Sequence, residues 1–396
     1  MFRILLALFL LPPLTGLAAD ALNSDNARAA ARLAEFTSDT APPPLFSIGR
    51  VDRAPDPDGK IAPGEWEDCA GFAAMRDFAT GRMLPGGGTA VIRGGYDDRN
   101  FYFLILIPGA RPDVPRRTDD DMTIFSDGGV TELMFAAPGD ARPRRIAVSA
   151  AGSMTDMTGL DRTFASDARY GIGTAADAKA PWLKNSGVAA PFYFIECAVP
   201  RQNLALPQDG FRFNVFHQGA QPSTLAPVKN SAAEVENFAE MRLLESGRNR
   251  FFWFGLGDPA TGDFRLPGFL LGGGAQPPQA AVELMVFKRG TAFRENTGFD
   301  EVDGALETYE QKANGSWRRL KFRTENRACD WFELTYRIDG EIQTRLNGPL
   351  AVRPPLALQV RKFPSAGQIE IVPESDSGAP VKVEISDGAK TLCAET

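Results

Sequence analysis

Histidine occurs only once in this chain of 396 residues, as His217. A Ser-His-Asp triad or a multi-histidine metal site would depend on that single side chain. The sequence also has no G-x-S-x-G, H-E-x-x-H or phosphate-loop motif. The glycine run 86–88 precedes a strand-like segment and therefore cannot place phosphate at a helix N-terminus. These absences argue against the common hydrolase and nucleotide-binding classes.

Positive charge is also in short supply. Lys and Arg number 43 against 50 Asp and Glu, which gives a net charge of −7 with no basic run. A nucleic acid is therefore a disfavoured partner. The only apolar run near membrane length lies in residues 1–19, where it follows one Arg, is broken by Pro12-Pro13 and ends in small residues. This pattern predicts a secretory signal peptide, and so a secreted or periplasmic protein without a transmembrane segment.

Cysteine is scarce too, with four residues placed as two in each half of the chain. An oxidising compartment permits one bridge per half, Cys69 with Cys197 and Cys329 with Cys393. Four buried free thiols are the alternative, because sequence cannot give the separation of the Cα atoms.

The segment 90–108 predicts a β-hairpin. Polar residues Asp97 to Asn100 form its turn, and the apolar run 101–107 reads as a central strand covered on both faces. Further short runs rich in β-branched and aromatic residues supply partner strands at 130–135, 145–149, 192–199 and 211–216. Their spacing predicts an all-β fold, an antiparallel β-sandwich. Within it, Trp66 is expected to pack onto the sheet, and Glu196, inside an apolar strand, needs a buried hydrogen-bond partner.

The length favours two domains. An N-terminal helix and a Pro-rich linker are predicted over 20–45, followed by the first sandwich over 46–272. The Gly- and Pro-rich segment 273–278 reads as a linker. Residues 279–396 contain further strand-like runs at sandwich spacing, which predict a smaller Ig-like all-β domain.

Several segments of the first sandwich, in order, resemble family 9 carbohydrate-binding modules. They are DGKIAPGEWEDCAGF (58–72), AVIRGGYDDRNFYFLI (90–105), FSDGGVTELMF (125–135), FYFIECAVP (192–200), GFRFNVFH (210–217) and DFRLPGFLL (263–271). The resemblance spans about residues 46–272 and implies a β-sandwich that binds a glycan, an oligo- or polysaccharide.

In that family two Trp rings hold the sugar between them, and by position they correspond to Phe125 and Phe264 here. Arg265 and Asp127 would then bond the sugar hydroxyls. The resemblance implies a secreted, non-catalytic protein that supports polysaccharide degradation. The Phe-for-Trp replacements, and Asp127-Gly128-Gly129 in place of an acidic pair, depart from the family pattern.

Two other interpretations remain open. Relatives of this sandwich hold haem between a His and a Met, for which His217 with Met122, Met134 or Met154 would serve. A surface module with no ligand is the other. Asp119-Asp120-Asp121 supplies oxygen ligands for calcium, although the spacing is not that of a twelve-residue calcium loop.

Overall fold

The structure is a computed structural model. It describes residues 42–85, 90–159, 161–227, 231–245, 257–258, 262–266, 279–287, 306–314, 320–323, 330–338, 341–350, 357–363, 368–374, 383–386 and 391–395. The predicted signal peptide 1–19, helix 21–36 and linker 273–278 lie outside the described residues.

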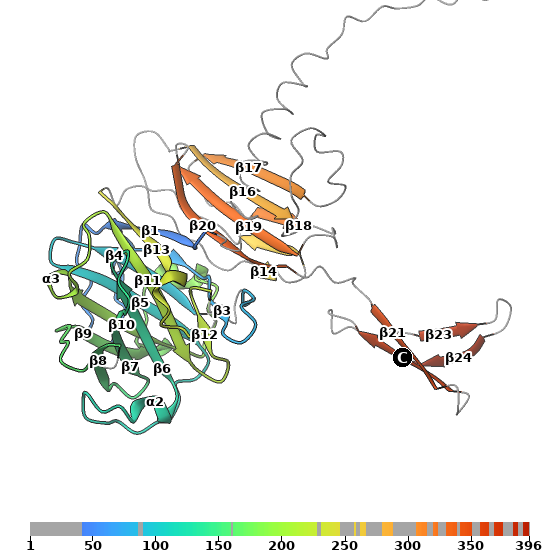
Figure 1. Ribbon diagram of the computed structural model, residues 1–396, viewed down its shortest axis with the longest axis horizontal. Helices are drawn as coiled ribbons and strands as arrows, with labels where there is room; N and C mark the ends of the chain where they lie inside the picture. Colours follow the sequence, from blue (N-terminus) through green and yellow to red (C-terminus); the bar gives the residue numbers. More distant parts are fainter. Residues whose placement is uncertain are drawn as a thin grey trace, which may run out of the picture.

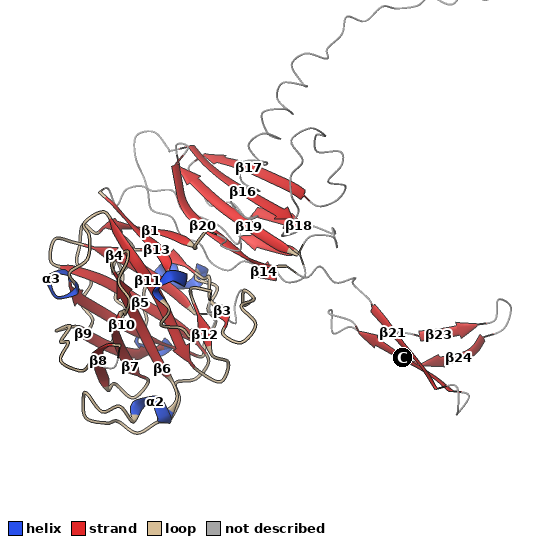
Figure 2. Ribbon diagram, in the orientation of Figure 1, coloured by secondary structure: helices blue, strands red, loops and turns tan. Residues whose placement is uncertain are grey.

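The chain is built almost entirely of strands (Figure 2). One sheet of the sandwich runs in the order β9 (Arg169–Thr174), β10 (Phe192–Pro200), β5 (Asn100–Pro108), β4 (Val91–Tyr96) and β2 (Ala70–Phe72). We call it the five-stranded sheet. Its strands are antiparallel, as the spacing of the strand-like runs predicted.

The facing sheet, the six-stranded sheet, runs in the order β8 (Met154–Thr158), β7 (Arg144–Ser149), β6 (Val130–Ala136), β11 (Gly210–Gln218), β13 (Ala239–Leu244) and β1 (Leu45–Arg50). The last two residues of β1 also pair with β4, which joins the two sheets at one corner. Figure 1 shows the two sets of strands packed together. Near its C-terminal end, beyond the residues that pair with β13, β11 also pairs with the short strand β12 (Ser223–Thr224), which in turn pairs with β3 (Arg76–Asp77).

The described helical segments are single turns: α2 (Ile124–Asp127), α3 (Arg201–Leu204), η1 (Ala175–Asp177), η2 (Pro181–Asn185) and η3 (Val235–Asn237). They connect strands and do not form a layer of their own (Figure 2).

The predicted hairpin is confirmed as β4 and β5. Asp97 forms its turn, because one carboxylate oxygen accepts the backbone N–H groups of Arg99 and Asn100, each at 2.7 Å, and the other accepts the hydroxyl of Tyr102 at 2.7 Å. Strand β5 is buried on both faces from Phe101 to Ile107, as its continuous apolar run predicted.

Between the sheets, alternate residues of the strands form the main core. Its centre is a group of phenylalanines in which Phe103 and Phe213 stack at 4.7 Å between ring centroids, with Phe135 at 5.3 Å from Phe213. All three are fully buried. Aromatic pairs at such distances contribute beyond their buried area, so this group holds the two sheets together.

The outer face of the five-stranded sheet is covered by the segment around Trp66. The Trp66 indole N–H donates to one oxygen of Glu196 at 2.8 Å, and the backbone N–H of Gly59 donates to the other at 2.8 Å. Both side chains are buried, which confirms the two predictions made for them. Two glycines of β9 allow the backbone at Gly59 to pack closely on this strand. An added Cβ would lie 2.2 Å from Gly59 N if placed on Gly171, and 2.3 Å from Gly59 O if placed on Gly173.

The predicted Cys69–Cys197 bridge is wrong, because both thiols are free and buried. Cys197 points into the core between the sheets, whereas Cys69 packs in the cluster on the outer face of the five-stranded sheet. Burial raises the pKa of each thiol to about 12, so both stay protonated at neutral pH. Cys329 and the side chain of Cys393 lie outside the described part of the chain.

The C-terminal half is also all-β. Four strands run in the order β17 (Leu306–Asn314), β16 (Gln279–Phe287), β19 (Trp331–Ile338) and β20 (Glu341–Pro349). A separate small sheet consists of β14 (Gly257–Asp258), β15 (Asp263–Leu266) and β18 (Leu320–Arg323). Two hairpins follow, β21 (Ala357–Phe363) with β22 (Gln368–Glu374) and β23 (Val383–Ser386) with β24 (Thr391–Glu395).

Strand pairings cross the boundary at the predicted linker. Strand β15 comes from the segment assigned to the end of the first sandwich, yet it pairs with β18 of the C-terminal half. Strand β20 in turn pairs with β1 at Leu45 and Arg345. Asn347 donates to the carbonyl of Pro42 at 2.7 Å, and Arg242 to that of Ile342 at 3.0 Å. The two halves therefore share hydrogen bonds across β1 and β20.

Arg76 is the most buried charged group at this junction, with 1% of its surface exposed. Its guanidinium donates to the backbone carbonyl of Asn347 and lies 3.5 Å from that of Gly81. Burial lowers the pKa of Arg76 to about 10. Arg76 thus links β3 of the sandwich to β20 of the C-terminal half.

We expect Arg76→Met to lower the free energy of unfolding by about 2 kcal/mol, because it removes hydrogen bonds from a charged donor and leaves a buried carbonyl without its partner. Calorimetry of the full chain measures the loss. Arg82→Met, at an exposed position nearby, is the control. An equal effect of both changes would contradict a role for Arg76 at the junction.

Candidate functional site

The structure does not bring the two predicted sugar-holding rings together. Phe264 lies in β15, is fully buried, and packs edge-on against Phe332 of β19 at 5.1 Å between ring centroids. Phe125 lies in α2, at the far end of the sandwich from β14 and β18 (Figure 1). The ring of Phe264 is a core residue of the C-terminal half, so a clamp between these two rings does not form.

The two predicted hydroxyl partners are also separated. Arg265 is the neighbour of Phe264 in β15, where it pairs with Lys321 of β18. Asp127 ends α2 and accepts two hydrogen bonds from Arg117, both at 2.9 Å. The hydrogen bond from Arg117 holds the pKa of Asp127 below its usual value. The four predicted residues therefore form two separate pairs, Phe125 with Asp127 in α2 and Phe264 with Arg265 in β15.

Phe125 remains partly exposed at one end of the outer face of the six-stranded sheet. It packs on the buried group formed by Ile124, Val130 and Ala147. The guanidinium of Arg145 lies 5.7 Å from its ring centroid, and Gln218 donates to its backbone carbonyl at 3.0 Å. The α2 turn is therefore held against the sheet with one aromatic face next to a cation.

A buried ion pair lies beside this ring. The Nε of Arg145 donates to Glu132 at 2.8 Å, and its Nη2 contacts the same oxygen. The Glu132 side chain is 6% exposed and that of Arg145 is 19% exposed. Burial raises the pKa of Glu132, and the Arg145 charge opposes that shift. The pair is thus a fixed donor and acceptor in which Arg145 is the more exposed partner.

A second aromatic group borders the pair on its other side. Phe216 is opposite Glu132 in the register of β11 and β6, and its ring contacts that of Phe78 edge-on at 5.2 Å. Phe216 and Phe78 are both partly exposed. We call the surface formed by Phe125, Arg145, Glu132 and Phe216 the Phe125 face.

Sequence reasoning did not select Phe216, Glu132 or Arg145, although a signal for Phe216 was present. On the strand FRFNVFHQ, Phe216 falls on the face that also carries Arg212, Asn214 and Gln218. An aromatic residue on a polar strand face is exposed unless something covers it. No comparable signal marks Glu132 and Arg145, because their pairing depends on the register of β6 and β7.

The middle of the same sheet face is covered by the segment after β12. Val235 and Phe238 pack on Met134 and Ala136 of β6, and Asn214 of β11 donates to the carbonyl of Ala232 at 2.9 Å. The Phe125 face therefore ends at this segment, and the other end of β11 forms a separate surface.

The geometry around His217 does not suit a haem ligand. Its Nδ1 lies 3.0 Å from the hydroxyl of Thr131, and an added Cβ on Gly219 would lie 2.6 Å from its Nε2. The side chain is buried, which lowers the pKa of His217 to about 4. The Nδ1 of His217 therefore already has a hydrogen-bond partner, and the backbone of Gly219 lies close to Nε2.

Two of the upstream methionines, Met134 and Met154, lie away from the His217 ring. Met134 is opposite Asn214 and so lies on the other face of β11 from His217. Met154 of β8 lies in the same row across the sheet as His217 of β11, with β6 and β7 between them. The two residues are therefore three strand spacings, or about 14 Å, apart. Met122 precedes α2. Neither Met134 nor Met154 is therefore placed to share one iron with His217.

The predicted calcium loop uses its carboxylates locally. Asp119 accepts the backbone N–H of Met154 at 3.0 Å, and Asp121 accepts that of Thr123 at 2.9 Å. Among the described residues, no group of three or more His, Cys, Asp or Glu side chains is placed to hold a metal ion. In the same part of the chain, no helix has the length and apolar character needed to span a membrane.

Comparison with known proteins found no matching family model and no matching curated protein. Solved structures with a related arrangement include a candidate carbohydrate-binding protein from Bacteroides uniformis, with 12% identity and a TM-score of 0.35 over 50% of this chain and 97% of that one. Two others are family 9 carbohydrate-binding modules from Caldicellulosiruptor kristjanssonii. One, in complex with cellotriose, has 14% identity and a TM-score of 0.34 over 51% of this chain and 94% of its own.

The second of these modules is in complex with glucose, and it has 15% identity and a TM-score of 0.34 over 50% of this chain and 96% of its own. Family 9 is the family that the ordered segments of this sequence resemble.

Proposed function

We propose that this protein is a secreted, non-catalytic carbohydrate-binding protein that holds a glycan on the Phe125 face in support of polysaccharide degradation. The observation that supports the proposal is the partly exposed ring of Phe125 beside the Arg145–Glu132 ion pair. Sugars have apolar C–H faces edged by hydroxyl groups. An aromatic ring covers the first, and fixed donors and acceptors bind the second.

The order of groups across this face suits a sugar chain. The ion pair lies between Phe125 on one side and Phe216 on the other, so adjacent sugar units could contact a ring while their hydroxyls bond the charges. The carboxylates here are each held by an arginine, Glu132 by Arg145 and Asp127 by Arg117. That arrangement favours hydrogen bonding over the proton transfer that glycoside hydrolysis requires.

We expect cellotriose to bind with a Kd of about 0.1 to 1 mM, which is about 4 to 5.5 kcal/mol. Phe125→Ala should weaken binding about five- to tenfold, because a stacked ring contributes about 1 kcal/mol. Phe216→Ala should have a similar effect. Isothermal titration calorimetry of the full chain measures both.

Phe164→Ala is the matched control, because Phe164 is a partly buried ring outside the Phe125 face. It should leave the affinity unchanged. Melting temperatures of the Phe125 and Phe216 variants should stay close to that of the unmodified chain, since both rings are partly exposed. Unchanged affinity in both variants, or no affinity for any glycan on an array, would point to a ligand-free surface module.

A further inference from the structure

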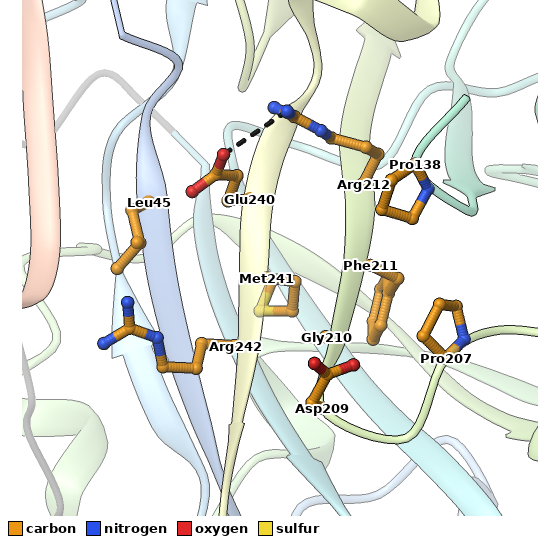
Figure 3. A pocket seen from close by; sticks show the side chains of 10 residues that line it. All are labelled: Leu45, Pro138, Pro207, Asp209, Gly210, Phe211, Arg212, Glu240, Met241 and Arg242. Atoms are coloured by element: carbon orange, nitrogen blue, oxygen red, sulfur yellow. Dashed lines mark ion pairs between the residues drawn. The ribbon is translucent and has the colours of Figure 1, made fainter. Parts of the chain in front are cut away.

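A separate pocket lies at the opposite end of β11 from the Phe125 face. Its volume is about 230 Å³, and it is formed by β1, β11 and β13 together with the loops that carry Pro138 and Pro207. Arg212 and Phe216 are four residues apart on β11, so the two surfaces are about 13 Å apart along the strand. We call this the Arg212 pocket (Figure 3).

Four ionised side chains line the pocket and their charges cancel. Arg212 lies 3.3 Å from Glu240 in an ion pair that is partly open to solvent, with the side chains 25% and 41% exposed. Arg242 and Asp209 lie at the other end of the pocket in Figure 3. The pocket has no net charge to select an ion, but it places donors next to acceptors. Hydroxyl groups, which donate and accept, match that pattern.

Apolar surface completes the pocket. The rings of Pro138 and Pro207 lie on the Phe211 side in Figure 3, and Leu45 lies on the opposite side. A ligand with apolar faces and a hydroxylated edge would contact both kinds of surface. The volume is below the range of about 300 to 1,000 Å³ that encloses drug-sized ligands, which limits the ligand to a small molecule such as one sugar ring.

The C-terminal half contributes to the pocket by holding Arg242. The guanidinium of Arg242 donates to the carbonyl of Ile342 in β20 at 3.0 Å, and β20 pairs with β1 at Leu45, which also lines the pocket. Two of the lining residues therefore depend on β20 for their positions.

We propose that the Arg212 pocket is a second carbohydrate-binding site, one that takes a single neutral sugar unit. This second site goes beyond the proposed function, because the Arg212 pocket shares no residue with the Phe125 face and has a different shape. The Phe125 face is an open surface suited to a chain, whereas the Arg212 pocket accepts one ring or one chain end.

Methyl-resolved NMR of the full chain separates the two sites, with D-glucose as the probe. The methyl signals of Leu45 and Met241 report on the Arg212 pocket, and that of Ile124, beneath Phe125, reports on the Phe125 face. Glucose should shift the first two signals with a Kd of about 1 to 10 mM. Phe125→Ala should leave the shifts of Leu45 and Met241 unchanged. Failure of the Phe125 face to bind a glycan would therefore not contradict sugar binding in the Arg212 pocket.

Glu240→Gln should weaken glucose binding at the pocket about tenfold, because it removes a charged acceptor and breaks the ion pair with Arg212. Glu240 is partly exposed, so this variant should fold normally. Arg212→Gln is a second variant with the same expected effect. Arg169→Gln, which breaks an exposed ion pair with Asp56 far from the pocket, should change nothing.

The proposal is overturned if Leu45 and Met241 signals do not move at about 100 mM glucose. It is also overturned if they move equally in Glu240→Gln, Arg212→Gln and the unmodified chain. Shifts of the Ile124 signal alone would leave the Phe125 face as the sugar site and remove the pocket from consideration.

Discussion

Replacing Glu196 with alanine is expected to lower the free energy of unfolding by about 3 kcal/mol or more. The carboxylate accepts the Trp66 indole N–H and the Gly59 backbone N–H, each at 2.8 Å, in a fully buried setting. Without it, two buried donors lose their acceptor, and each such donor costs about 1 to 3 kcal/mol. Urea unfolding followed by tryptophan fluorescence measures the loss.

Glu196→Gln separates hydrogen bonding from volume. One oxygen can still accept, but the amide NH₂ faces a second donor, so at pH 5 we expect a loss of about 1 to 3 kcal/mol. Glu67→Gln, an exposed carboxylate in the same covering segment, is the control and should stay within about 0.5 kcal/mol. A Gln variant as stable as the control would show that these two bonds contribute little.

Glu196 also makes the free energy of unfolding depend on pH. Burial raises the pKa of Glu196 to about 8, against the effect of the two hydrogen bonds, whereas a glutamate in the unfolded chain titrates near about 4.3. Between these values the folded protein keeps a proton that the unfolded chain releases. The contribution of Glu196 is therefore fully present below about pH 4 and is lost as the pH rises to about 8.

The difference in unfolding free energy between the unmodified chain and Glu196→Gln isolates this contribution from other titrating groups. We expect the difference to shrink as the pH rises from 5 to 8, by at most about 1.4 kcal/mol per unit. Unfolding curves at several pH values test it. A constant difference would mean that Glu196 does not change its protonation in this interval.

Gly171→Ala is expected to cost about 3 kcal/mol, although alanine normally stabilises a strand relative to glycine. An added Cβ would lie 2.2 Å from the backbone nitrogen of Gly59 and 2.7 Å from the carbonyl oxygen of Pro57. Neither atom belongs to a flexible side chain. The covering segment would have to move away from β9, which breaks the Gly59 hydrogen bond to Glu196.

Gly139→Ala provides the control. Gly139 has a φ of +90° and nothing within 4 Å of an added Cβ, so its cost is backbone strain alone, about 1 to 2 kcal/mol. Thermal unfolding of the two variants should rank Gly171→Ala as clearly more destabilised. The reverse order would show that the segment around Gly59 does not rest on β9.

Local sequence determined the strands and turns of the first sandwich. Strand β5 was predictable because its apolar run is continuous, and its turn because Asp97 can accept neighbouring backbone N–H groups. The need for a buried hydrogen-bond partner at Glu196 followed from the cost of placing a carboxylate in an apolar strand without one. Alternation also set the two faces of β11, and with them the exposure of Phe216.

Contacts between distant residues were decided only by the tertiary structure. Phe264 resembles a ligand-holding ring by its position in the sequence, but the pairing of β15 with β18 buries it against Phe332. Cys69 and Cys197 are the two cysteines of the first half of the chain, which suggested a disulfide, yet they lie on opposite faces of one sheet. The pairing of strands brings Glu132 next to Arg145, and it brings Arg242 within hydrogen-bond distance of the Ile342 carbonyl. Periodicity gives the face on which a side chain lies but not the strand beside it, because strand pairing depends on packing across the whole sheet.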